Sequence, residues 1–132
     1  MATEIQVSFL IFTNDDDPNS VADKLSYKPQ LIWFKGNIIG KSLIKHKNSG
    51  LEYKNDMIKE IELEKEINNL VEPLWTHKDE IIKIIDSNNY ETELSIVLYI
   101  DENELPILNF PNALVQKIAD LRASIDIDII LI

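Results

Sequence analysis

Apolar residues recur with two different periods along this chain of 132 residues, and the order of the two periods limits the folds open to it. An apolar residue at every second position is typical of strands, and spacings of three and four are typical of helices. The alternating period marks residues 4–12, 92–100 and 125–131. The helical spacing marks residues 18–28, 63–74, 76–85 and 111–121. Because helical segments lie between strand segments, we expect an α+β fold.

We expect these elements to form a two-layer sandwich, in which a largely antiparallel sheet carries its helices on one face. Each end of the chain has the order strand, helix, strand, which resembles half of a ferredoxin-like unit. The sequence contains no internal repeat, low-complexity tract or linker. Residues 1–132 are therefore expected to form a single domain.

Local signals predict where several helices begin and end. Asp17 followed by Pro18 predicts a capped helix start, because Asp accepts a hydrogen bond from a free amide and Pro needs no partner there. Pro73 predicts a break or kink in the longest helix. Thr76 and Asp79 then have the spacing of a capping box, which predicts a restart.

Three weaker patterns predict further strands. Residues 30–35 read as a strand whose Trp33 side chain we expect in the core. Residues 41–46 and 51–58 are expected to pair as a hairpin across residues 47–50, and residues 105–110 as a short strand.

Composition limits the setting of the protein. The chain is 45% hydrophobic and has no Cys, which suits a reducing compartment and excludes disulfides and thiolate chemistry. No apolar run is long enough to cross a membrane, and the N-terminal residues lack the pattern of a secretory signal. We expect a cytoplasmic protein without a membrane partner.

The charge is strongly acidic, at −10, and unevenly distributed. Acids outnumber bases 23 to 13, and Arg122 is the one arginine, which argues against nucleic acid as a partner. Residues 35–59 hold six lysines and two acids, which we interpret as a solvated hairpin surface. Residues 60–132 hold sixteen acids and five bases.

No sequence motif predicts catalysis, a cofactor or a metal. Asp15, Asp17 and Asn19 have the spacing that opens a calcium loop, but the Gly and Glu that complete such a loop are missing, which favours helix capping. His46 and His77 fall on different elements, outside any paired zinc motif, and His77 is expected to be exposed. We therefore expect a protein that is not an enzyme and binds no metal or cofactor.

Acidic clusters and one tryptophan are the candidate partner-binding residues. We assign this role to Trp75, Glu91, Glu93, Asp101, Glu102 and Glu104. Negative charge attracts a cationic protein, although the same acids would also serve as a solubilising surface. Trp75 follows Pro73 at a helix junction and fits either a core wedge or an exposed anchor.

The arrangement resembles the bacterial domain of unknown function family 4279 along nearly the whole chain. The opening strand and the Asp-rich turn before Pro18 carry the resemblance. So do Lys28-Pro29, Trp33-Phe34-Lys35-Gly36, and residues 94–99 and 119–128. One departure lies before the long helix, where the family often carries a Trp and this chain has Tyr53 and Met57. The resemblance implies an α+β fold and bacterial origin, and it supplies no catalytic residues.

Members of that kind can lie beside toxin genes as small immunity proteins, and this implication suggests a function. The leading hypothesis is a non-catalytic protein that neutralises a cognate toxin by masking its basic active surface. The alternative is a stand-alone structural or homo-oligomeric domain, such as a homodimer, with no toxin partner.

Overall fold

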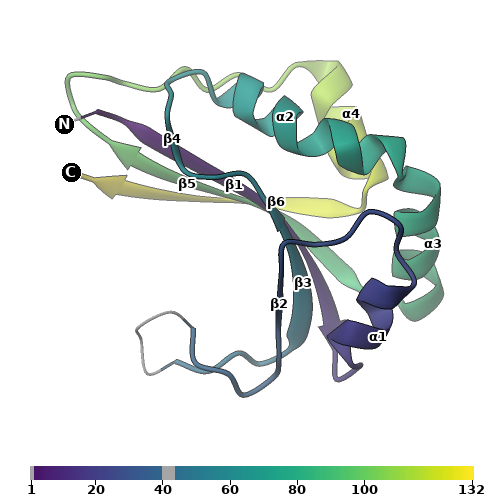
Figure 1. Cartoon of the computed structure of the whole chain (residues 1–132). Helices are drawn as coiled ribbons and strands as arrows, with labels where there is room; N and C mark the ends of the chain where they lie inside the picture. The colour runs from purple at the N-terminus through teal and green to yellow at the C-terminus, as the bar shows by residue number, and fades with distance from the viewer. Residues whose placement is uncertain (1, 40–43) are drawn as a thin grey trace.

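The computed structural model describes residues 2–39 and 44–132, and in these residues the expected α+β fold is confirmed. The described strands form one mixed sheet in the order β2-β3-β1-β5-β6, and β4 also pairs with β1 (Figure 1). Their bounds are β1 Glu4–Asn14, β2 Leu31–Trp33, β3 Ser49–Lys54, β4 Ile58–Lys59, β5 Glu91–Ile100 and β6 Ala123–Leu131. The helices are α1 Pro18–Asp23, α2 Leu63–Thr76, α3 Lys78–Asn88 and α4 Asn112–Asp120.

The sheet is antiparallel except at one border. The strand pairs β1–β3, β1–β4, β1–β5 and β2–β3 are antiparallel, whereas β5 and β6 are parallel and are joined through α4. At the other end of the chain, β3 separates β1 from β2, so the β1-α1-β2 unit is split by one strand as in a ferredoxin-like half. The sequence of elements therefore agrees with the expectation at both ends.

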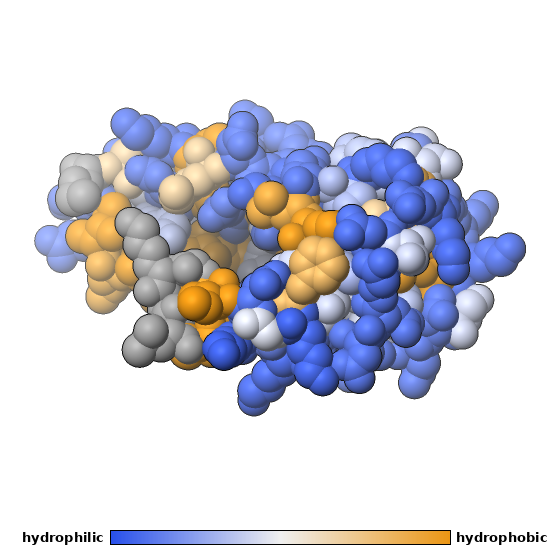
Figure 2. Space-filling model, turned by 60° about the horizontal axis from the view of Figure 1, so that its bottom comes forward, coloured by the Kyte–Doolittle hydropathy of each residue, from blue (hydrophilic) through white to orange (hydrophobic). Residues whose placement is uncertain are grey.

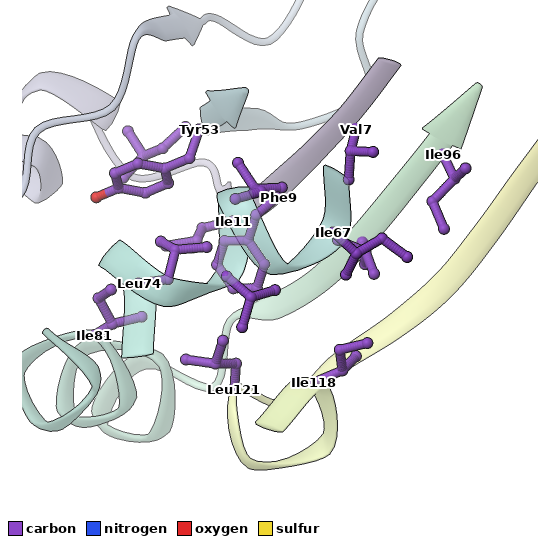
Figure 3. Packing of buried hydrophobic residues seen from close by; sticks show 14 of the residues in the cluster. Val7, Phe9, Ile11, Tyr53, Ile67, Leu74, Ile81, Ile96, Ile118 and Leu121 are labelled. Atoms are coloured by element: carbon purple, nitrogen blue, oxygen red, sulfur yellow. The ribbon is translucent and has the colours of Figure 1, made fainter. Parts of the chain in front are cut away.

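One face of the sheet packs against the helices and forms the core. Alternation in β1 directs Ile5, Val7, Phe9 and Ile11 to this face, and all four are at most 1% exposed. Figure 3 shows the inner residues of β1 close to Ile67 and Leu74 of α2. Burying a side chain of this size contributes about 1.5–3 kcal/mol, so this face is the main source of stability.

The helix ends follow the sequence in one place and depart from it in two. The Asp17 carboxylate accepts a hydrogen bond from the Asn19 amide at 3.0 Å, so the predicted cap of α1 is confirmed. The chain stays helical through Pro73, so of the predicted break or kink the break does not occur, and α2 ends three residues later. The predicted capping box is also wrong, because the Thr76 hydroxyl donates to the Glu72 carbonyl and no side chain caps α3.

His77 separates α2 from α3 and is half-buried, which corrects the expectation that it is exposed. Its ring stacks on Tyr27 at a centroid distance of 5.2 Å, and its Nδ1 lies 2.9 Å from the Pro73 carbonyl oxygen. Tyr27 stacks in turn on Tyr53, whose hydroxyl donates to the Tyr27 carbonyl at 2.6 Å. Burial raises the pKa of Tyr53 above its ordinary value. The aromatic stack joins His77, at the junction of α2 and α3, to Tyr27 and Tyr53.

Two of the weaker predictions, a hairpin and a short strand, are wrong. The expected hairpin falls partly on residues 40–43, which lie outside the described residues, but residues 49–54 form β3 and pair with β1 and β2. Residues 105–110 form no strand; Ile107 makes one isolated bridge to Glu62. On α4, Leu114 and Ile118 are buried, whereas Val115 is exposed.

None of the helices in the described ranges has both the length and the apolar character that crossing a bilayer requires.

Candidate protein-binding surface

Among the described residues, no helix lies on the second face of the sheet, and we call it the helix-free face. Its residues are those that alternate with the core residues along each strand. They include Leu10, Phe12, Leu31, Trp33, Glu91, Glu93, Asp126 and Asp128. Figure 2, which brings the lower side of the molecule forward, shows apolar side chains bordering a hollow on this side.

Trp33 anchors the β2 end of the helix-free face. Its ring meets Phe12 edge-on at a centroid distance of 5.8 Å and stacks with His46 at 5.2 Å. The indole Nε1 donates to the Asn48 carbonyl at 2.8 Å. Trp33 is thus half-buried on the face opposite to the core, which corrects the expectation of a core residue.

Gly50 makes the position of Trp33 possible. Gly50 of β3 lies opposite Trp33 of β2 on one side and opposite Phe12 of β1 on the other. A Cβ atom on Gly50 would overlap carbons of the Trp33 ring and would lie 2.7 Å from the Ile11 carbonyl oxygen. The indole therefore rests across the backbone of β3, and a side chain at position 50 would displace it.

Two hollows on the helix-free face meet at Phe12. The first, of about 250 Å³, is lined mainly by apolar groups and includes Trp33, Ile39 and Ile44, with Lys45 and Lys47 at its border. The second, of about 420 Å³, is more polar and includes Glu91 and Glu93. We call the two hollows together the groove, and its lining changes from aromatic and apolar in the first to acidic in the second.

The acidic side of the groove continues onto β6. Strand register places Glu93 beside Ser124, and Asp126 and Asp128 follow on the same face. Burial raises the pKa of Glu93 above its ordinary value, and the neighbouring Asp126 and Asp128 carboxylates raise it further. Repulsion among these three carboxylates is what a cation at this place would relieve.

We call Glu91, Glu93, Asp126 and Asp128 the acidic row. The arginine beside this row is engaged elsewhere. Arg122 borders the second hollow, but its guanidinium makes a two-bonded pair with the Asp86 carboxylate, at 3.0 and 3.1 Å. None of the ion pairs found within the described parts of the chain involves Glu91, Glu93, Asp126 or Asp128. The acidic row therefore presents its charge to solvent.

The predicted partner-binding residues do not come together. Glu91 and Glu93 lie at the start of β5 on the helix-free face, whereas Asp101, Glu102 and Glu104 follow its end. Ten residues of extended strand separate Glu91 from Asp101, or about 33 Å. A partner contacting both clusters would have to span the length of the sheet.

The Asp101–Glu104 turn has a structural role. The Asp101 amide donates to the Thr3 hydroxyl at 3.0 Å, and the Thr3 hydroxyl donates to the Glu104 carbonyl. Asp101 is buried, and the Asn103 amide that donates to its carboxylate lowers the pKa of Asp101 below its ordinary value. The turn fastens the residues before β1 to the end of β5, while Glu102 stays exposed.

Trp75 lies in the helix layer, away from the acidic row. It is half-buried on α2, and the Lys78 ammonium lies 4.0 Å from its ring centroid. The Lys117 ammonium lies 5.7 Å from the same centroid. Cations already occupy the ring face, so Trp75 is neither a core wedge nor a free anchor for a basic partner.

Sequence reasoning missed the part of the surface formed by Phe12, Trp33, Asp126 and Asp128. Period-two alternation assigns each of these residues to one side of its strand. It does not reveal that the four side chains lie on the same face of the sheet, because that depends on strand order and register. His46, which belongs to no metal-binding motif, stacks on Trp33.

Within residues 2–39 and 44–132, no three His, Cys, Asp or Glu side chains lie close enough together to hold a metal ion.

Comparison with known proteins identifies a family and nothing closer. Residues 3–131 match a family described as a domain of unknown function (DUF4279). No curated protein and no solved structure matches the chain. The match covers nearly every residue of the elements described above.

Proposed function

This chain belongs to the DUF4279 family, and we propose that it is a non-catalytic binding protein that holds a basic protein partner on the helix-free face of its sheet. The observation that carries this proposal is the acidic row beside a half-buried aromatic group. Glu93, Asp126 and Asp128 repel one another, and no ion pair within the described residues neutralises them.

The charge of the face favours a cationic partner and orients it. A net charge of −10 attracts a basic protein over long range, and the acidic row lies on the β5–β6 side. Lys45 and Lys47 lie at the other side of the groove. A partner with one basic patch would therefore approach in one orientation, with that patch over β5 and β6.

The aromatic side of the groove supplies a place for an anchor. Binding energy concentrates in a few well-packed residues, and an apolar hollow beside Trp33 and Phe12 is a suitable receptor for an apolar side chain. Trp33 is already held by its bond to Asn48 and by stacking on His46, so little side-chain freedom is lost on binding.

Within this class, we propose an immunity protein that masks the active surface of a cognate toxin. Enzymes that cleave nucleic acids hold phosphates with Lys and Arg, and such a surface is complementary to the acidic row. Covering that surface would inhibit the toxin by exclusion and charge neutralisation, without chemistry by this chain.

The test begins with affinity capture of the tagged protein from its own cells at low and high salt, with mass spectrometry. We expect to capture a basic protein in a stoichiometric amount at low salt and to lose it at high salt, because screening weakens exposed charge pairs. The captured partner is then purified and titrated. Recovery of the bait alone, at a size above 15.2 kDa on size exclusion, would support the self-assembling alternative.

Matched variants locate the contact. Glu91→Lys with Glu93→Lys is expected to weaken capture of the purified partner by tenfold or more, whereas Asp23→Lys with Asp56→Lys changes net charge equally at exposed sites elsewhere. Equal losses in the two double variants would show that net charge, and not the helix-free face, holds the partner.

A further inference from the structure

The outer edge of strand β6, which we call the β6 border, is a feature of the molecule that the proposed function does not explain. β6 pairs with β5 over nine residues, from Thr92–Ala123 to Ile100–Leu131, and it is the last strand of the sheet (Figure 1). Its other border pairs with no strand among the described residues. Such a border is a template for a further strand.

The backbone groups that point outward follow from the parallel register. The Ile132 amide donates to the Ile100 carbonyl at 3.0 Å, so position 132 directs its backbone toward β5. Backbone groups alternate sides along a strand. The amides and carbonyls of Ile125, Ile127 and Ile129 therefore point away from β5, toward solvent.

The side chains of β6 differ in kind between its two faces. Ile125, Ile127 and Ile129 continue the helix-side face past the helices and are 42%, 38% and 57% exposed. Asp126 and Asp128 lie on the helix-free face, beside Glu93. An added strand would thus meet apolar groups on one face and carboxylates on the other.

We propose that the β6 border pairs with an extended segment of the protein partner in which apolar and basic residues alternate. The apolar residues would pack beside Ile125, Ile127 and Ile129, and the Lys or Arg residues would face Asp126 and Asp128. Main-chain bonds supply affinity in this mode, and the alternating side chains select the segment. The inference rests on the proposed function, because it takes the occupant to be part of the same basic partner.

The charges disfavour direct overlap of this border with that of a second copy of the chain. Antiparallel pairing of two β6 strands about Ile127 would set Asp126 of one copy opposite Asp128 of the other. Like charges directly opposite one another destabilise a strand pair. A shift of one residue would instead mix apolar and acidic side chains on each face. A segment with Lys or Arg at alternate positions removes both conflicts.

A defined probe tests the border without the natural partner. The probe is a fluorescein-labelled peptide, Val-Lys-Val-Lys-Val-Lys-Val with blocked ends, titrated against the whole protein at low salt and followed by anisotropy. We expect saturable binding at one peptide per chain. A peptide with the same residues in two blocks, Val-Val-Val-Val-Lys-Lys-Lys, is expected to bind at least about tenfold more weakly, since it cannot present one kind of residue to each face.

Variants of the protein separate pairing from simple attraction. Asp126→Lys with Asp128→Lys should weaken probe binding by about tenfold or more. The double variant Asp23→Lys with Asp56→Lys, with the same net charge, should lose much less. Ile127→Pro removes an outward amide and no bond to β5, and it should abolish binding while the far-ultraviolet spectrum is retained.

Amide exchange gives a readout that does not depend on charge. The amides of Ile125, Ile127 and Ile129 should exchange more slowly when the probe is bound. Unchanged exchange at these amides, equal binding of the two peptides, or equal losses in the two charge variants would each overturn the inference.

The two proposals fail in different ways. If the purified partner is lost with Glu91→Lys and Glu93→Lys but is unaffected by Ile127→Pro, the helix-free face binds and the β6 inference is wrong. If the probe protects β6 but capture yields no basic protein at either salt concentration, the border accepts a strand and the proposed function is wrong.

Discussion

β5 and β6 are neighbouring parallel strands with nearly the same alternation of apolar and polar residues, yet only β5 is buried. Leu94, Ile96 and Leu98 of β5 are fully buried, whereas their partners on β6 are between 38% and 57% exposed. The helix layer covers the β5 residues and leaves those of β6 partly bare. The comparison teaches that the same strand pattern forms part of the core in one position and a partly exposed border in the next.

Truncating matched residues in the two strands should give the largest difference. Ile96→Ala removes a fully buried side chain and should cost about 2–5 kcal/mol of unfolding free energy. Ile127→Ala, its partner in register, should cost about 1 kcal/mol or less, because water already reaches that side chain. Urea unfolding measures both, and equal losses would mean that β6 is covered in solution.

β2 forms the opposite border of the sheet, and its Trp33 side chain extends the comparison because it lies across β3 on the helix-free face. Gly50→Ala should cost about 1–3 kcal/mol, since the added methyl group would collide with the Trp33 ring. Gly36→Ala is the control: position 36 has a φ of +91° and open space, so any loss there is one of backbone strain alone. Trp33 fluorescence should change in Gly50→Ala and stay nearly constant in Gly36→Ala.

The smallest effect should come from the carboxylates on the helix-free face of the two strands. Because the pKa of Glu93 is raised in the folded protein, its ionised form opposes folding at neutral pH. Glu93→Gln should therefore stabilise the protein at pH 7, by less than about 1 kcal/mol after solvent screening.

An acid that is paired with a cation usually stabilises the folded protein when it ionises. Ionisation of Glu93 has the opposite effect on the free energy of unfolding. As pH falls through the raised folded pKa and then the ordinary glutamate pKa, Glu93 becomes neutral in both states and the advantage of Glu93→Gln should vanish. Urea midpoints measured from pH 7 to pH 3 follow it. A stabilisation that persists at pH 3 would contradict the electrostatic explanation.

Much of the fold followed from local patterns, and the departures have physical causes. Alternation at residues 4–12, 92–100 and 125–131 predicted the strands that the structure shows at 4–14, 91–100 and 123–131, and the Asp17 cap predicted α1. The hairpin at residues 41–58 was wrong where the structure describes it, because the residues of β3 gain more by pairing between β1 and β2. Pro73 failed as a helix breaker because α2 is held by its buried face.

The candidate site was predictable only in part. Glu91 and Glu93 do lie on an exposed acidic surface, but Asp101 and Glu104 fasten a turn, and Trp75 packs under lysines. Acidic composition cannot separate a carboxylate that faces solvent from one that accepts hydrogen bonds from its own turn. That distinction depends on which backbone amides lie within about 3 Å.

The sequence by itself determined the kinds of elements, their order and the two chemically different sides of each strand, because side-chain period is a local property of the backbone. The tertiary structure decided which strands border the sheet, how far the helices reach and which sides become one surface. Those features depend on pairing between segments far apart in the chain, such as the pairing that sets Trp33 and Phe12 on either side of Gly50. The side-chain period of a single segment does not predict such pairing.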